Sequence, residues 1–252
     1  MTTGLIGSSG FVGGNLLRQT VFDSHYRSAD IDSIRGQSFS SLVCAGAYAA
    51  KWKANQDPAS DRAAIERLMA PLREVAADRF VLLSTVDVYE SPIDVDESAP
   101  ADARHAYGQH RALLEEFVRG RFPKSTIVRL PGLFGSGLKK NVIYDLLHDN
   151  QVEKINPEGV FQYYDLGHLW ADVQRAQQQG IAVLNVATEP IATRELAQRC
   201  FGRLLAPGAG GTAPRYDLRS LHAAAWGGKG GYLYDRETVL RELSEFVSRS
   251  VR

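Results

Sequence analysis

The fold of this chain is decided near its start by the sequence Gly7-Ser8-Ser9-Gly10-Phe11-Val12-Gly13. An apolar run, Gly4-Leu5-Ile6, precedes it and is typical of the end of a buried strand. The stretch from Phe11 to Arg18 follows, and its apolar residues share one side of a short helix. Glycines between a strand and a helix let a backbone approach a ligand closely, and a helix N-terminus attracts phosphate. The pattern therefore predicts contacts to a dinucleotide's pyrophosphate from Gly7, Gly10, Phe11, Val12 and Gly13, although an ordinary strand-to-helix turn is the alternative.

Composition favours a globular protein that binds a small molecule. The 252 residues suffice for one large α/β domain or a domain with a small lobe. Basic and acidic residues each number 29, so the net charge is zero, and no basic stripe indicates nucleic acid. No signal peptide precedes the first strand, and no stretch approaches the ~20 apolar residues of a membrane span. We therefore expect a cytoplasmic protein without membrane contact, in which Cys44 and Cys200 are core thiols.

Short runs rich in Val, Ile and Leu alternate with helical segments, which indicates a parallel sheet covered on both faces. The expected strands are Thr3–Ile6, Ser41–Ala45, Phe80–Ser84, Thr126–Leu130 and Val183–Val186. Another strand fits near Tyr26–Ser28, but Ala29–Ser40 is too short for a full helix and strand, so one crossover is abbreviated. The fold class is therefore α/β, a Rossmann-type doubly wound parallel sheet with a small C-terminal substrate lobe.

Helical periodicity and glycine-rich segments divide the chain further. Helices are expected at Asp61–Ala77, Ala106–Phe122, Asn141–Leu147, Leu169–Gln179 and Arg236–Arg249. Pro71 should kink or split the first of these, because proline removes a backbone donor. Pro207–Gly211 and Gly227–Gly231 are expected to be loops. We expect a dinucleotide-binding domain of residues 1–135 and 160–189, and a smaller lobe of residues 136–159 and 190–252.

Two hydroxyl residues and a cation carry the predicted chemistry. Thr85 follows a buried strand, at the sheet edge where open α/β folds bind ligands. Tyr107 and Arg111 are four residues apart on one helix, so they share a face. A neighbouring positive charge lowers the pKa of a phenol from its usual value of about 10. This spacing predicts Tyr107 as a proton carrier.

These features together resemble the extended short-chain dehydrogenase/reductases, which include the nucleotide-sugar epimerases and dehydratases. The resemblance rests on the glycine turn, on the hydroxyl residue at a strand end in Ser84-Thr85-Val86-Asp87-Val88-Tyr89, and on Tyr107-Gly108-Gln109-His110-Arg111. Cys44-Ala45-Gly46-Ala47 and Arg129-Leu130-Pro131-Gly132-Leu133-Phe134-Gly135 are similar to two further segments of that family.

The resemblance implies a role for each matching residue. Thr85 would hydrogen-bond the reacting oxygen, Tyr107 would exchange its proton, and Arg111 would hold the nicotinamide ribose. Further cofactor contacts would come from Ala45, Gly46, Ala47 and Pro131. Asp87, Asn141 and Gln162 are the candidate substrate contacts, the last two beside Lys139-Lys140 and Phe161-Gln162-Tyr163-Tyr164. The resemblance also implies a homodimer formed through Asp61–Ala77 and Ala106–Phe122.

The sequence departs from the family pattern at two positions. Arg111 stands where the family has lysine, and a guanidinium does not relay a proton as an ammonium can. Gly132 replaces an asparagine that contacts substrate in many nucleotide-sugar enzymes of the family. The substrate class therefore stays open at this point.

Coenzyme preference is usually set just after the second strand. Arg27 and Ser28 there suit the 2′-phosphate of NADP, whereas Asp30 and Asp32 are close enough to favour NAD if the strand ends later. The expectation is NADP, with NAD as the alternative.

No other chemistry has a matching motif. The six histidines lack the companions of a metal site, so no metal is expected. Gly7-Ser8-Ser9-Gly10 lacks the spacing of a hydrolase nucleophile turn, and Lys229 is not followed by Ser or Thr as in a nucleotide-triphosphate loop. The sequence predicts an NAD(P)-dependent oxidoreductase or epimerase/dehydratase acting on a sugar or nucleotide-sugar hydroxyl or ketone. A non-catalytic NAD(P)-binding sensor or scaffold is the alternative.

Overall fold

The computed structural model describes residues 2–206 and 212–250, which form two compact units. The first unit comprises Met1–Ser91, Ala99–Arg129 and Gly167–Leu184. The second comprises Pro92–Ser98, Leu130–Leu166 and Asn185–Arg252.

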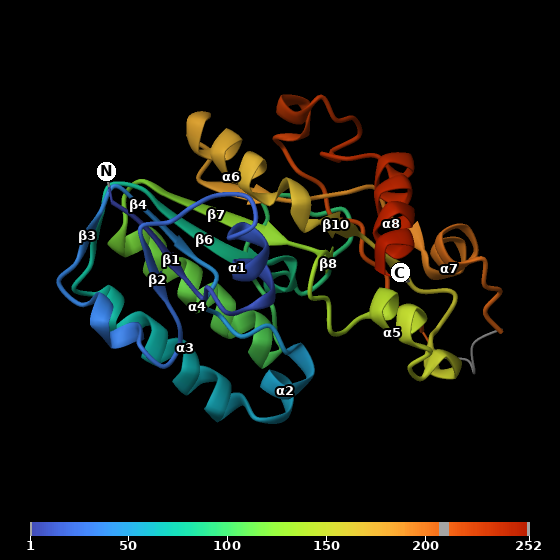
Figure 1. The fold of residues 1–252 in the computed structure, drawn as a ribbon, viewed down its shortest axis with the longest axis horizontal. Helices are drawn as coiled ribbons and strands as arrows, with labels where there is room; N and C mark the ends of the chain where they lie inside the picture. Colours follow the sequence, from blue (N-terminus) through green and yellow to red (C-terminus); the bar gives the residue numbers. More distant parts are fainter. Residues whose placement is uncertain (1, 207–211, 251–252) are drawn as a thin grey trace. The chain divides into compact units, whose positions relative to one another are not determined.

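A six-stranded sheet organises the first unit (Figure 1). In spatial order, its strands are β11 (Val183–Asn185), β7 (Ser125–Leu130), β6 (Phe80–Thr85), β4 (Ser41–Cys44), β1 (Thr3–Ile6) and β2 (Ser24–Tyr26). Strand β1 pairs in parallel with both β2 and β4, and β4 pairs in parallel with β6. The order reverses direction at β1, so the carboxyl ends of β1, β4 and β6 meet at the edge where such sheets bind ligands. The Rossmann-type expectation is confirmed.

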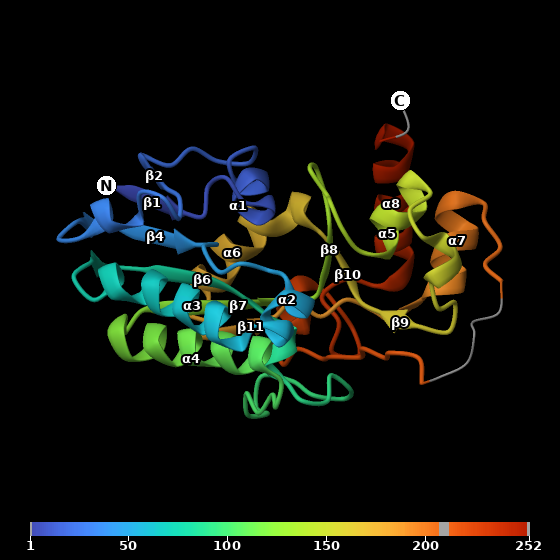
Figure 2. The ribbon, with the colours of Figure 1, turned by 90° about the horizontal axis from the view of Figure 1, so that it is seen from below.

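Helices cover both faces of this sheet, as Figure 2 shows. The helices of the unit are α1 (Phe11–Leu16), α2 (Lys51–Gln56), α3 (Pro58–Leu72), α4 (Ala106–Arg121) and α6 (Leu169–Gln178). Helices α3 and α4 lie side by side on one face, and α1 and α6 lie on the other. The short elements are η1 (Ile31–Ile34), β3 (Ser38–Phe39), β5 (Ala76–Ala77), η2 (Val86–Val88) and η4 (Leu166–His168).

Apolar side chains from the sheet, α3 and α4 make the core of the first unit. Phe80 and Phe122 stack with ring centroids 4.2 Å apart, and both are almost fully buried. Ile65, Leu68 and Leu72 recur at helical spacing along the buried face of α3. This apolar layer fixes α3 and α4 against the sheet, and α4 carries Tyr107 in its first turn.

Two expected boundaries were wrong. Helix α3 begins earlier because Pro58 stands in its first turn, where proline is favoured, and Asp57 caps it by accepting from the Ser60 N–H. It ends at Leu72, so Pro71 lies in the last turn and neither kinks nor splits the helix. Strand β2 ends at Tyr26, which makes Arg27 the first residue beyond it. The abbreviated crossover is confirmed, because η1 alone fills the place of a helix there.

The second unit has its own apolar core, built mainly from its three longer helices. Phe134, Leu196 and Leu243 are among its fully buried members. Its helices are α5 (Val142–His148), α7 (Thr193–Phe201) and α8 (Arg236–Ser250), with short turns η3 (Val152–Lys154) and η5 (Ala223–Trp226). Strands β8 (Gly132–Phe134) and β10 (Tyr163–Asp165) pair in parallel, and β9 (Val160–Phe161) and β12 (Ile191–Ala192) pair antiparallel.

Several sequence expectations concern the second unit and the cysteines. Gly227–Gly231 is a turn, as expected, whereas Pro207–Gly211 lies outside the described residues. Cys44 is buried, which raises the pKa of its thiol to about 11, and Cys200 is half-buried. Over residues 2–206 and 212–250, no helix is both long enough and apolar enough to cross a membrane.

Candidate functional site

The glycine turn packs the end of β1 against α1 and against the segment after β4. Gly7 has a φ of +83°, and a Cβ atom there would lie 2.4 Å from the carbonyl oxygen of Ala45. A Cβ atom on Gly13 would lie 2.2 Å from the carbonyl oxygen of Gly7. Both positions therefore need glycine for the packing of the protein itself.

Gly10 differs because little of the protein lies against it. It is the N-cap of α1, and no side chain caps the helix. Its φ of −78° is open to any residue, and a Cβ atom would meet only the Gly7 carbonyl oxygen, at 3.2 Å. Phe11 and Val12 supply the first backbone N–H groups of the helix. This uncapped, uncovered backbone fits the phosphates of a dinucleotide.

The end of β2 places a cation beside the same turn. The Gly7 N–H donates to the carbonyl oxygen of Tyr26 at 2.8 Å, so the next residue, Arg27, follows directly from that contact. The Arg27 side chain is 64% exposed. Asp30 turns back and accepts the Arg27 backbone N–H at 2.5 Å, and this hydrogen bond lowers the pKa of the Asp30 carboxyl. Ser28 lies between them in the same turn.

The segment after β4 touches the glycine turn from the other side. The Ala45 N–H donates to the carbonyl oxygen of Ile6 at 2.9 Å. A Cβ atom on Gly46 would lie 2.9 Å from the Ile6 side chain and 3.2 Å from that of Leu68. The segment Ala45 to Ala47 therefore lies along the sheet edge between the glycine turn and β6.

Thr85 and Tyr107, predicted separately from the sequence, meet at this edge. Thr85 is the last residue of β6, and its hydroxyl, close to that of Tyr107, acts to lower the pKa of the phenol. The Thr85 oxygen also accepts the N–H of Asp87 at 3.1 Å. A Cβ atom on Gly108 would lie 2.2 Å from the Asp87 carbonyl oxygen, so only glycine lets α4 start this close to β6.

Two further contacts fix the first turn of α4. His105 caps the helix, because its Nδ1 accepts the Gly108 N–H at 3.0 Å. The Tyr107 N–H donates to Oδ1 of Asn55 in α2, also at 3.0 Å. Burial and the nearby Lys51 ammonium lower the pKa of His105, so its ring stays neutral. Tyr107 itself is buried, with 6% of its surface exposed.

The expected lowering of the Tyr107 pKa was wrong for the chain by itself. Burial is the largest influence and raises the pKa of the phenol above its usual value. Arg111 acts in the expected direction but does not overcome burial. The spacing between Tyr107 and Arg111 is visible in the sequence, whereas the burial of the Tyr107 ring is not.

Arg111 lies over the face of the Tyr107 ring, with its Cζ atom 4.1 Å from the ring centroid. Its Nη1 donates to the Asp61 carboxylate and its Nη2 to the carbonyl oxygen of Tyr48. Among the described residues, its buried Nε has no hydrogen-bond partner. Burial alone would raise the pKa of Asp61, but hydrogen bonds from Arg111 and from His110 at 2.7 Å hold it below its usual value.

Lys51 also belongs to this group, although no sequence pattern singled it out. Its Nζ atom lies 2.7 Å from Oδ1 of Asp87. The Lys51 side chain is 40% exposed and that of Asp87 18%. Asp87, a candidate substrate contact, is therefore already paired with a cation from α2. Helix α2 is short and has no strong apolar periodicity, so nothing in the sequence pointed to Lys51.

The other candidate contacts belong to the second unit. Asn141 caps α5, because its Oδ1 accepts the N–H groups of Ile143 and Tyr144, and its Nδ2 donates to the Leu133 carbonyl oxygen at 2.8 Å. The amide that was expected to face a substrate is thus used by the chain's own backbone. Pro131 follows β7 directly.

Gln162 has a similar structural role. It is 1% exposed, its Nε2 donates to the carbonyl oxygens of Thr188 and Leu218, and its Oε1 accepts the Leu218 N–H at 2.8 Å. These backbone contacts fill the hydrogen-bonding capacity that the substrate role required. The amides of Asn141 and Gln162 thus both bind the backbone of the chain.

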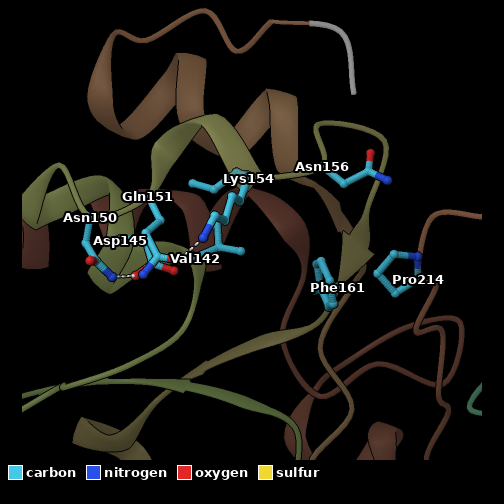
Figure 3. Close-up of a pocket in the computed structure, with 9 residues that line it drawn as sticks. Val142, Asp145, Asn150, Gln151, Lys154, Asn156, Phe161 and Pro214 are labelled. Carbon is cyan, nitrogen blue, oxygen red and sulfur yellow. Dashed lines mark hydrogen bonds between the residues drawn. The ribbon is translucent and has the colours of Figure 1, made fainter. Parts of the chain in front are cut away.

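A hollow of about 230 Å³ lies in the second unit (Figure 3). It is lined by Val142, Asp145, Asn150, Gln151, Lys154, Ile155, Asn156, Phe161 and Pro214. Its polar side chains pair with one another: Asn150 donates to Asp145 at 2.6 Å and Lys154 donates to Gln151 at 2.9 Å (Figure 3). Phe161, from the segment that the sequence analysis named with Gln162, lines it, whereas Asn141 and Gln162 do not.

Of the comparisons with known proteins, only the one with solved structures found proteins similar to this chain. No protein-family model matches the sequence, and no curated protein matches it. The chain is similar to UDP-glucose 4-epimerase from Thermotoga maritima, solved with UDP-glucose, with a TM-score of 0.70, 15% identity and 100% of both chains covered.

Two further structures give the same result. RMD from Pseudomonas aeruginosa, complexed with NADPH, matches with a TM-score of 0.76 and 17% identity over 100% of this chain and 99% of that one. dTDP-4-dehydrorhamnose reductase from Bacillus anthracis, in complex with NADP, gives 0.75 and 16% over 99% of each chain. The chain therefore has the same fold as these three structures.

Proposed function

We propose that the chain is an NAD(P)-dependent oxidoreductase or epimerase/dehydratase of the extended short-chain type. Its substrate would carry a hydroxyl or ketone on a sugar or nucleotide sugar. Structures with the same fold were solved with UDP-glucose, with NADPH and with NADP, which supports this assignment. We assign coenzyme binding to the first unit and substrate binding mainly to the second.

One observation carries this proposal: the hydroxyl groups of Thr85 and Tyr107 come together at the carboxyl edge of the sheet. A packed core has no need of two hydroxyls at that edge, whereas proton transfer to a carbonyl needs one donor and one orienting group. Thr85 would hydrogen-bond the substrate oxygen, and Tyr107 would give or take its proton. Two strands away along the same edge lies the Gly10 backbone.

Several residues of the first unit would hold the coenzyme. The backbone at Gly10 to Val12 would bind the pyrophosphate, and Ala45 to Ala47 would lie beneath the dinucleotide. Arg27 would meet the adenosine ribose, and Pro131 would contact the nicotinamide end, as the resemblance implies. When bound, a nicotinamide coenzyme supplies hydride exchange. The raised pKa of Tyr107 keeps its phenol protonated near neutral pH, which suits donation to a ketone.

Coenzyme binding is tested by titrating the purified chain with NADPH and NADH and following nicotinamide fluorescence. We expect saturable binding that Gly10→Ala weakens at least about tenfold, because a methyl group would stand over the backbone used by the pyrophosphate. Gly14→Ala is the matched control, since a Cβ atom there meets nothing within 4 Å. Turnover is then sought with nucleotide-sugar and keto-sugar substrates.

Three outcomes of this titration count against parts of the proposal. Absence of binding by either coenzyme contradicts it altogether. If the Gly10→Ala and Gly14→Ala variants bind the coenzyme equally well, the pyrophosphate does not lie against the backbone of Gly10. Tight binding without turnover on the whole substrate panel favours a sensor or scaffold.

Coenzyme preference gives a separate prediction. We expect NADPH to bind more tightly than NADH, because the exposed Arg27 side chain follows the strand directly and its 3.4 Å ion pair with Asp30 can give way to a 2′-phosphate. Arg27→Ala should weaken NADPH binding about tenfold, the effect of one charge-assisted hydrogen bond of about 1.5 kcal/mol. NADH binding should not change. An equal loss for both coenzymes would place Arg27 elsewhere than at the 2′-phosphate.

A further inference from the structure

We propose that Lys51 provides the ammonium group that assists the Tyr107 hydroxyl, in place of the arginine at position 111. This inference rests on the proposed function, since it assigns a positioning residue to the same proton carrier. Lys51 comes from α2, a separate helix, and not from the helix that bears Tyr107.

Arg111 is held away from this role by its own contacts. Its guanidinium is bonded to the Asp61 carboxylate and the Tyr48 carbonyl oxygen, and it is 3% exposed. It lies over the face of the phenol ring. A guanidinium held on the ring face by two partners is a fixed charge, and it does not pass on a proton.

Helix α2 is attached to the first turn of α4 at Tyr107. Oδ1 of Asn55 accepts the Tyr107 N–H at 3.0 Å. Lys51 lies four residues before Asn55, so the two side chains leave α2 on the same face, one turn apart. The contact made by Asn55 therefore also directs Lys51 toward the start of α4.

Asp87 sets where the ammonium group lies. The distance from Lys51 Nζ to Asp87 Oδ1 is 2.7 Å. The Asp87 N–H donates to the Thr85 oxygen, and its carbonyl oxygen packs against Gly108. The ion pair is thus built on the segment that joins the two hydroxyl residues of the site.

The charged groups around Tyr107 belong to α2, α4 and η2. Arg111 of α4 lowers the pKa of the phenol, Asp87 of η2 raises it, and Lys51 of α2 lowers it by a smaller amount than Arg111. His105 is neutral, and Thr85 contributes a hydroxyl. Of the two cations, Lys51 has a partly exposed side chain with a proton to exchange. It can also move with its three rotatable donors.

The test follows the ionisation of Tyr107 without coenzyme or substrate. The chain is labelled with ¹³Cζ-tyrosine, Tyr107→Phe identifies the resonance, and NMR spectra are recorded through the alkaline range. Lys51→Met should raise the pKa of Tyr107 by about one unit, the low end of the effect of a neighbouring charge. Lys51→Arg should keep most of the wild-type value, and Asp87→Asn should lower it.

Lys53→Met is the matched control, because Lys53 is on the same helix but lies over the Tyr48 ring, 6.0 Å from its centroid. Thermal unfolding of each variant reports whether α2 remains folded. The pH profile of kcat is then compared between wild type and Lys51→Met, and its alkaline limb should move with the NMR value.

Two results would overturn the inference: a Tyr107 resonance that titrates alike in Lys51→Met and Lys53→Met, or a shifted resonance with an unchanged pH profile. Failure of the proposed function gives a different pattern. Wild-type protein would then show no turnover at all, while the NMR titration would still report the Lys51 contact.

Discussion

Replacing Tyr107 by phenylalanine is expected to reduce kcat by about 10²–10⁴-fold, the usual contribution of a general acid or base. The substitution removes one oxygen atom from a buried ring. Arg111 would keep its place on the ring face, because the guanidinium contacts the π system and its own two partners. Binding of NADPH should therefore change little.

The measurement is coenzyme oxidation with the nucleotide-sugar or keto-sugar substrate on which the wild type is most active. Tyr48→Phe is the control, because Tyr48 is 65% exposed and meets Arg111 through its backbone carbonyl. The control should retain full turnover. If Tyr107→Phe also retained it, another group would carry the proton, and the Thr85–Tyr107 pair would be structural.

A second prediction for the same site concerns pH. The raised pKa of Tyr107 means that the phenol is protonated over the neutral range. Ketone reduction needs that proton and should be flat in this range, whereas alcohol oxidation needs the phenolate and should rise with pH. This asymmetry is specific to a tyrosine whose burial outweighs its neighbouring cations.

The sequence was sufficient to predict the parallel sheet and to single out Thr85 and Tyr107, which the structure brings together. Strand-end position and helical phase place both residues at the same edge, and those signals are local. Gly108 completes the arrangement, since the approach of α4 to β6 depends on its missing Cβ atom. A glycine directly after a candidate catalytic tyrosine is visible in the sequence, but the backbone it admits is not.

The side-chain contacts that the sequence could not predict join residues that are far apart in the chain. Asp61 binds Arg111 across 50 residues, and Gln162 binds Leu218 across 56. Such contacts decide whether a polar side chain faces a ligand or the chain's own backbone. Lys51 was missed for the same reason, because its ion pair with Asp87 spans 36 residues.

The largest expected effect on stability comes from a buried ion pair behind the site. Glu115 on α4 is fully buried and accepts from Arg129 of β7, with Oε2 2.6 Å from Nη2. Ser84 donates to the Glu115 carboxylate at 2.6 Å, and Arg129 donates to the Tyr89 hydroxyl at 2.6 Å. Burial would lower the pKa of Arg129, but Glu115 holds it above its usual value.

Glu115→Ala should lower the free energy of unfolding by about 3–5 kcal/mol, because it leaves the Arg129 guanidinium buried without a counter-charge. Urea unfolding measures the change. Glu116→Ala is the control: Glu116 is the next residue on α4 but is exposed, and its loss should cost no more than about 0.5 kcal/mol. A loss below about 1 kcal/mol for Glu115→Ala would mean that water or a shifted side chain neutralises Arg129.

The double variant Glu115→Leu with Arg129→Met separates the cost of an orphaned charge from the value of the pair. Apolar residues of similar volume often replace a buried ion pair without loss, so we expect the double variant to recover most of the stability. Turnover should not recover to the same degree. Glu115 lies two turns after Tyr107 on α4 and bonds Ser84, the residue before Thr85. The pair therefore sets the position of α4 along β6, and apolar packing without directional bonds would allow the hydroxyls of Thr85 and Tyr107 to move apart.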